Sequence, residues 1–188
     1  MTKEELPYYG DANNQQDVIA RCISGDESAF KSLYDNHSNV MYNTAYRIVN
    51  SQPDAEDLVQ DAFLDAFRNI SGFENRSAFS TWLKRILIYK CINHLKKKKI
   101  IANELKDNYS DSIASEESSD EEEIQWEVNK VLKGIELLPD HYRLVINLYL
   151  IEGYDHEEIA LITHLPEATV RTQYVRGKRK LVDIIKRF

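Results

Sequence analysis

Three groups of side chains in this sequence have types and spacings suited to binding. Acidic residues recur about every four positions through 54–70. Aromatic, guanidinium and amide groups recur through 82–93, and four lysines follow at 96–99. Thr, Gln and Arg gather in the C-terminal stretch 167–187. The sequence shows no nucleophile–base pairing, glycine-rich phosphate loop or metal-ligand spacing, so it predicts no catalytic residue, no metal site and no cofactor.

Residues 54–70 predict an amphipathic helix with one apolar and one acidic face. The apolar positions recur at helical spacing: Ala55, Leu58, Val59, Ala62, Phe63, Ala66, Phe67 and Ile70. Pro53 and Asp54 mark the start, because Asp caps the free amides of a first turn. Asp61 and Asp65 lie too far along the helix to benefit from its dipole. The acidic face therefore either meets only water or receives a basic partner.

Residues 77–97 predict a helix whose polar side suits single-stranded nucleic acid. Its apolar positions, placed at about 100° per residue, are Leu83, Leu87, Ile88, Cys91, Ile92 and Leu95. The opposite side carries Trp82, Arg85, Tyr89, Asn93 and Lys96. Aromatic rings stack on unpaired bases, and Lys and Arg neutralise phosphates. The alternative is that Trp82 and Tyr89 belong to the core and that the lysines only solubilise the helix end.

The C-terminal stretch predicts a helix-turn-helix. Residues 155–163 form its first helix, a turn follows, and residues 167–187 form the second helix. The second helix has an apolar seam with alternating spacings of four and three: Val170, Tyr174, Gly177, Leu181, Ile184 and Phe188. Its polar face carries Arg171, Thr172, Gln173, Arg176 and Arg179. These side chains reach base edges in a major groove; a plain basic surface helix is the alternative.

The elements that would position these groups are helical. Gly and Pro number only six and four, and β-branched alternation is absent, so the predicted fold class is all-α. The net charge of −7 is concentrated at 103–123, with nine acids and one base. Outside that segment, bases nearly balance acids and are clustered. We expect two small helical domains joined by a flexible acidic linker, the C-terminal one a winged-helix-like DNA-binding domain. The predicted parts are a flexible leader at 1–15, domains at 16–99 and 124–188, and the linker at 100–123.

The two cysteines, Cys22 and Cys91, lie far apart in apolar helical context. They are expected to be reduced core residues and neither a disulfide nor a metal pair. No apolar run approaches the roughly 20 residues of a membrane span, and the N-terminus lacks a signal-peptide core. The sequence therefore predicts a cytoplasmic protein without membrane insertion.

The sequence resembles bacterial RNA polymerase sigma factors of the extracytoplasmic-function (ECF) type, which carry only regions 2 and 4 of the sigma family. Four segments in this order carry the resemblance: GDESAFKSLYDNH, DAEDLVQDAFLDAF, FSTWLKRI and TVRTQYVRGKRKL. The similarity spans about residues 17–99 and 127–181. It implies a non-enzymatic specificity subunit that binds core RNA polymerase, recognises the −35 and −10 promoter elements and stabilises strand opening. An anti-sigma factor is the partner expected to control it.

The resemblance also implies roles for particular residues. The helix at 54–70 would dock on the clamp helices of the polymerase β′ subunit, and the C-terminal domain would meet the β flap. The implied polymerase contacts are Asp57, Gln60, Asp61 and Asp65. The implied −10 contacts, with a flipped base in the loop, are Phe73, Asn75, Arg76, Phe79, Trp82, Arg85, Tyr89, Asn93, Lys96 and Lys97. The implied −35 contacts are Arg171, Thr172, Gln173, Arg176 and Arg179.

Three positions depart from the family pattern. Tyr89 stands where members commonly have Asn, and Tyr cannot copy a bidentate amide, so base preference at −10 is in question. His164 and Ala168 stand where Gly is frequent; His tolerates a left-handed backbone better than most residues. The rival function is a stand-alone helix-turn-helix regulator, which would bind duplex sites without polymerase.

Overall fold

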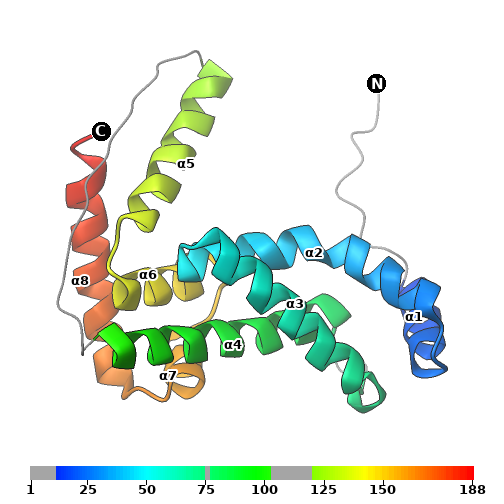
Figure 1. Cartoon of the computed structure of the whole chain (residues 1–188). Helices are drawn as coiled ribbons and strands as arrows, with labels where there is room; N and C mark the ends of the chain where they lie inside the picture. The colour runs from blue at the N-terminus through cyan, green and yellow to red at the C-terminus, as the bar shows by residue number, and fades with distance from the viewer. Residues whose placement is uncertain (1–11, 75–76, 103–119) are drawn as a thin grey trace. The chain divides into compact units, whose positions relative to one another are not determined.

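The computed structural model describes residues 12–74, 77–102 and 120–188, and these contain helices and no strand (Figure 1). The helices are α1 (Ala12–Ile23), α2 (Glu27–Val49), α3 (Gln52–Arg68), α4 (Phe79–Ala102), α5 (Asp120–Glu136), α6 (Asp140–Ile146), α7 (His156–Thr163) and α8 (Glu167–Ile185). Two short turns are η1 (Ile70–Gly72), a 3₁₀ turn, and η2 (Asn147–Ile151), a π-helical turn. The prediction of an all-α fold with two helical domains is confirmed.

The chain divides into two compact units: Met1–Ala45 with Pro53–Lys90, and Tyr46–Gln52 with Cys91–Phe188. Several helix ends differ from the predicted ones. The helix α1 begins at Ala12, so the last residues of the predicted leader are helical. Both ends of the predicted linker are also helical, because α4 continues to Ala102 and α5 begins at Asp120. The remainder of the predicted linker, 103–119, lies outside the described residues.

The first unit is built on the apolar stripe of α3. Ala55, Leu58, Val59, Ala62, Phe63, Ala66 and Ile70 are buried as predicted, and Phe67 is half-buried. Rings of α2 pack on this stripe: the centroid of Tyr34 lies 4.8 Å from that of Phe63. The ring of Phe30 meets Phe67 edge-on at 4.8 Å. Burial of this stripe leaves the opposite side of α3 facing outward, because a helix presents its faces at fixed angular spacing.

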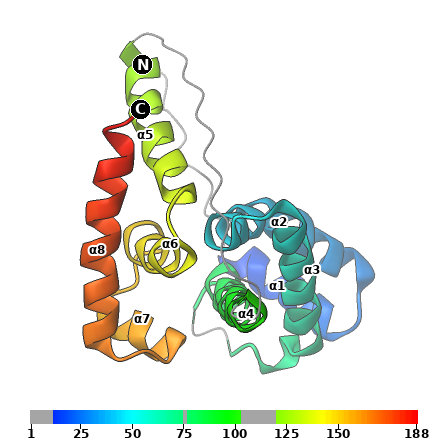
Figure 2. The same ribbon diagram turned by 60° about the vertical axis from the view of Figure 1, so that its left-hand side comes forward.

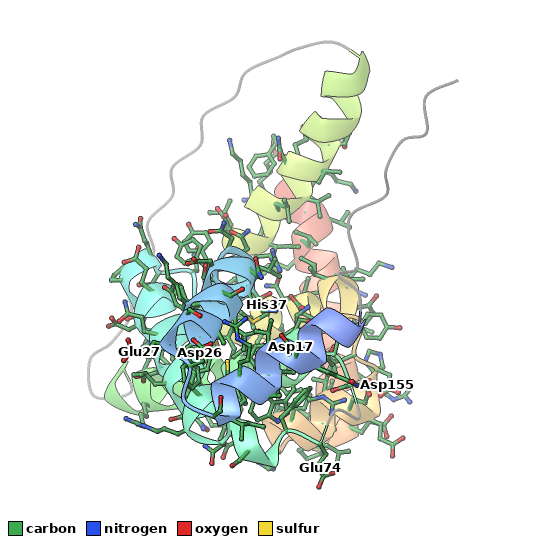
Figure 3. All side chains as sticks on the ribbon, turned by 90° about the vertical axis from the view of Figure 1, so that its right-hand side faces the viewer. Asp17, Asp26, Glu27, His37, Glu74 and Asp155 are labelled. Carbon is green, nitrogen blue, oxygen red and sulfur yellow. The ribbon has the colours of Figure 1, made fainter. Side chains whose placement is uncertain are left out.

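Asp26 caps the start of α2 (Figure 3). Its Oδ1 accepts hydrogen bonds from the backbone N–H of Ser28 at 2.8 Å and from the Ser28 hydroxyl at 2.6 Å. Its Oδ2 accepts from Arg21 Nη2 at 2.7 Å. The hydrogen bonds from Ser28 and then Arg21 lower the pKa of Asp26 to about 2. Asp26 therefore links the end of α1 to the start of α2 through hydrogen bonds to both helices.

In the second unit, α5 and α8 run side by side and α6 and α7 both pack against α8 (Figures 1 and 2). Their shared core contains Ile135, Leu138, Ile146 and Leu181. Gly177 allows the close approach of α8 to α6. A Cβ placed there would lie 3.2 Å from Ile146 Cγ1 and 3.2 Å from Tyr142 Cβ.

The buried Arg143 joins three backbone segments of the second unit. Its side chain donates to the carbonyl oxygens of Leu138 at 2.7 Å and Ile48 at 3.2 Å. Its charge is paired with Asp140 at 2.5 Å. The carbonyls at the end of a helix have no partner within that helix, so the Arg143 guanidinium satisfies acceptors at the ends of α2 and α5 that burial would otherwise leave unpaired.

Candidate nucleic-acid and protein interfaces

The outward side of α3 is an acidic face made of Asp57, Gln60, Asp61 and Asp65. The side chains of Asp57, Gln60 and Asp61 are exposed, and that of Asp65 is half-exposed. Asp65 pairs with Lys90 of α4, with 2.5 Å between Oδ2 and Nζ, and lies 3.7 Å from Arg68 Nη1. The structure thus places all four predicted polymerase contacts on the side opposite the buried stripe. Lys90 could not be predicted as the partner of Asp65, because nothing local in the sequence links residues 25 positions apart.

Phe73, which follows η1, forms an aromatic cluster with Phe79 and Trp82 at the start of α4. Their ring centroids lie 5.9 Å apart for Phe73 and Phe79, 5.2 Å for Phe73 and Trp82, and 5.8 Å for Phe79 and Trp82. His37 of α2 adds a ring 5.5 Å from Phe79 (Figure 3), and burial lowers the pKa of His37. The cluster therefore packs Phe73 against the start of α4, and the ring of His37 packs α2 against the same end of α4.

Burial separates the aromatic cluster into two parts. The side chains of Phe73 and Phe79 are buried, with 7% and 0% of their surface exposed, whereas Trp82 is half-buried. Both phenylalanines are thus core residues of the first unit, and their contact with DNA stays a prediction. Asn75 and Arg76, the other two loop residues predicted to contact DNA, lie outside the described residues.

The polar side of α4 faces solvent over most of its length, as predicted. All six apolar positions named above for this helix are buried. Tyr89 is 53% exposed, and Arg85, Lys96 and Lys97 are exposed, while Asn93 is half-buried. The alternative that Tyr89 belongs to the core is therefore wrong. An exposed ring flanked along one helix by cations has the composition that single strands bind, through stacking and phosphate neutralisation.

The helix-turn-helix is built by α7 and α8. Asp155 caps α7 through a capping box: its carboxylate accepts from the N–H of Glu158 at 2.8 Å, and Glu158 accepts from the N–H of Asp155 at 2.9 Å. His164 ends α7 in the left-handed region with φ 57°, as its place in the turn predicts. The apolar seam of α8 is buried at Val170, Gly177 and Leu181.

The polar face of α8 is open. Arg171, Thr172, Arg176 and Arg179 are exposed, and Gln173 is half-buried. The Thr172 hydroxyl donates to Ala168 O at 2.7 Å within the helix. Arg171 donates to Glu167, one turn earlier. Glu167 is a further residue of this face, and the sequence carries a signal for it, because an acid four residues before an arginine is a recognisable helical pair.

No group of three or more His, Cys, Asp or Glu side chains among the described residues is arranged to hold a metal ion. None of the helices described is long and apolar enough to cross a membrane. Cys22 and Cys91 are both buried and unbonded, as predicted. Burial raises the pKa of both thiols, that of Cys91 to about 12.

Two family descriptions match the chain. Residues 33–100, which include α3 and most of α4, match Sigma-70 region 2. Residues 129–181, which include α7 and most of α8, match Sigma-70 region 4. Similar solved structures support the fold: the sigma factor RpoE in complex with the anti-sigma factor NepR from Bartonella quintana has a TM-score of 0.56 and 22% identity, covering 84% of this chain and 96% of that one. CnrH in complex with the cytosolic domain of CnrY has a TM-score of 0.52 and 22% identity, covering 92% and 97%.

Curated relatives cover nearly the whole chain. The ECF RNA polymerase sigma factor SigW of Bacillus subtilis (strain 168) is 33% identical over 172 residues, which are 87% of this chain and 92% of SigW. The ECF RNA polymerase sigma-E factor of Escherichia coli (strain K12) is 31% identical over 176 residues, 88% of this chain and 91% of that protein. Because both sigma regions are matched and the ECF sigma factor SigW is 33% identical over most of both proteins, the chain belongs to the family of ECF RNA polymerase sigma factors.

Proposed function

We propose that this sigma factor binds core RNA polymerase through the acidic face of α3. The observation that carries the proposal is the outward clustering of Asp57, Gln60 and Asp61 on a helix whose other side is buried. Water solvates these side chains in the free protein, and a basic partner surface would complement their charge, which steers two proteins together. The partner surface proposed is the clamp helices of the β′ subunit, with the β flap as a second contact for the C-terminal domain.

The polar side of α4 would hold the melted non-template strand of the −10 element. Trp82, Arg85, Tyr89, Asn93, Lys96 and Lys97 would supply its stacking and phosphate contacts. Phe73 and Phe79 would shape the loop pocket for a flipped base, together with Asn75 and Arg76. Unstacking a base costs a few kcal/mol, which stacking on an exposed ring such as Tyr89 offsets.

The polar face of α8 would read the −35 element as duplex DNA. The contacts proposed are Arg171, Thr172, Gln173, Arg176 and Arg179. The N-terminal part of the second helix of a helix-turn-helix lies nearest the base edges. We therefore assign base contacts to Arg171 and Thr172 at the start of α8 and include Arg176 among the candidates for base readout.

The functional division we propose follows the chain. Residues 16–99 would serve polymerase and −10 binding, residues 124–188 would serve −35 binding, and the acidic segment would let the two span both elements. The protein would act without enzymatic chemistry, in the cytoplasm where polymerase works. The similar structure of RpoE is a complex with the anti-sigma factor NepR, and we propose control of the same kind here.

Reconstituted transcription with core polymerase from the same organism tests this function. Genomic fragments would be transcribed with core alone and with core plus the purified protein. Start sites that appear only with the protein support the proposal, provided that the protein alone binds the same fragments weakly. Tight binding to duplex sites without polymerase, and no change in start sites, would instead support the stand-alone regulator.

A further inference from the structure

An ion pair lies on the reading face of α8, at its first turn. Arg171 donates from Nε to Glu167 Oε1 at 2.8 Å and from Nη2 to the same oxygen at 2.6 Å. Both side chains remain open to a ligand, since 64% of the Arg171 side chain and 43% of the Glu167 side chain are exposed. The described residues around Arg176 and Arg179 provide no acidic partner of this kind.

The two hydrogen bonds use one edge of the guanidinium and leave the other edge available. Nε and one N–H of Nη2 point to Glu167, so both N–H groups of Nη1 and the second N–H of Nη2 stay unused by this pair. That outer edge presents two parallel donors in one plane. The major-groove edge of guanine offers two acceptors, O6 and N7, which an arginine contacts in this bidentate way.

From this geometry we propose that Glu167 is a specificity-determining residue of the −35 element, acting as a positioning residue for Arg171. Glu167 holds the Arg171 fork with its outer edge turned to the groove, so that Arg171 reads one guanine. The proposal rests on the proposed function, because it needs α8 to lie in the promoter duplex.

The charge of Glu167 distinguishes base reading from phosphate binding. A carboxylate beside a phosphate repels it, so an arginine that serves only the phosphate backbone is weakened by an acid held against it. An arginine that reads a base gains from the same acid, because the acid removes the freedom of the long side chain before DNA binds. The first turn of the second helix is also where base contacts occur in a helix-turn-helix. The pair therefore fits base readout better than phosphate binding.

The test is promoter selection by the holoenzyme. Core polymerase with wild-type protein, Glu167→Ala, Arg171→Ala or the double variant would select from a promoter library randomised across the −35 element. Arg171→Ala should reduce preference for one guanine about 5- to 150-fold, the equivalent of about 1–3 kcal/mol. Glu167→Ala should reduce preference at that same position at least about fivefold, and the double variant should lose no more than Arg171→Ala alone.

Two controls keep the proposal falsifiable. Asp183→Asn removes an exposed acid from the same helix and should leave the preferred sequence unchanged, which excludes a simple effect of net charge. Thermal unfolding should be the same for all variants, which excludes a folding defect. An affinity change that is equal for all sequences, or a shift in preference at another position, would overturn the proposal. If the wild-type holoenzyme selects no promoter sequence, the proposed function itself is overturned. Failure of the Glu167 proposal is therefore distinguishable from failure of the proposed function.

Discussion

Lys90 Nζ of α4 lies 2.5 Å from Asp65 Oδ2 of α3. The pair joins the acidic face of α3 to the helix that carries the exposed Tyr89, one residue before Lys90. Asp65 is therefore partly neutralised within the protein, whereas Asp61 is exposed and has no ion-pair partner among the described residues. Asp61 is consequently the sharper probe of polymerase binding, and Asp65 also reports on how α3 and α4 hold together.

Reversal of charge at Asp61 should abolish most of the binding to core polymerase. We expect Asp61→Lys to lower the affinity about tenfold or more, because like charges brought together at an interface cost several kcal/mol. Fluorescence anisotropy of the labelled protein titrated with core measures this affinity. Asp35→Lys, an exposed charge reversal on α2, is the matched control and should bind as wild type. Equal affinities for the two variants would contradict the docking assignment.

The Asp65–Lys90 pair should contribute little to stability. In a double-mutant cycle of Asp65→Asn and Lys90→Met, urea unfolding should give a coupling free energy of about 0.2–1 kcal/mol, as expected of partly exposed pairs. The coupling should shrink at high salt, because ions screen exposed charges. A coupling well above this range that persists in high salt would mean that the pair behaves as a buried one.

Replacement of Tyr89 should separate stacking from hydrogen bonding at the −10 element. Tyr89→Ala should weaken holoenzyme binding to the non-template strand by about 1–3 kcal/mol, the worth of one base stacked on an aromatic ring. Tyr89→Phe keeps the ring and should remain close to wild type. Binding to a fluorescent single-stranded −10 oligonucleotide measures both. A Phe variant as weak as the Ala variant would assign the contact to the hydroxyl.

The Cys91 thiol should resist alkylation in the folded protein. Burial raises its pKa from 9.0 to about 12, so almost no thiolate exists at pH 8, and the side chain has 0% exposure. Mass spectrometry after iodoacetamide should show modification of Cys91 only in denaturant. Rapid alkylation of native protein would show that the helix opens locally.

The same shift predicts how stability depends on pH. Because the folded pKa of Cys91 lies above the unfolded one, the unfolded chain loses the proton first as pH rises. The contribution of this thiol is complete below pH 9.0 and is lost progressively toward about pH 12. Urea midpoints of wild type should fall more steeply from pH 8 to pH 10 than those of Cys91→Ala. If the urea midpoints of the two proteins fall in parallel with pH, titration of Cys91 is not the cause of the pH dependence.

A side chain at Gly177 should force α8 away from α6. A Cβ there would already lie 3.2 Å from Ile146 Cγ1, so Gly177→Leu should destabilise the second unit by about 1–3 kcal/mol or more, as overpacking does. Urea unfolding measures the loss. Lys178→Ala, at the exposed neighbouring position, should stay within about 0.5 kcal/mol of wild type. Equal stability of the Leu variant would show that the helices can separate without cost.

Helical periodicity allowed much of the fold and of the candidate surfaces to be predicted. The buried stripe of α3, the buried side of α4 and the seam of α8 all follow from residue spacing of three and four, because side chains on a helix return to one face with a period of 3.6. The exposed acids of α3 and cations of α8 follow from the same rule. The Glu167–Arg171 pair is equally local and was open to prediction, but Glu167 was considered only as a helix start.

What the sequence determined by itself was the helices predicted at 54–70, 77–97 and 167–187 and the face that each one buries, since both depend on neighbours within two turns. Tertiary structure alone decided that Phe73 and Phe79 sit inside the first unit, because that depends on packing against Trp82 and on the ring of His37, which lies far away in the chain. It alone also paired Asp65 with Lys90 across two helices. Contacts of this kind depend on how helices cross, and side-chain spacing along one helix carries no information about the residue that arrives from another.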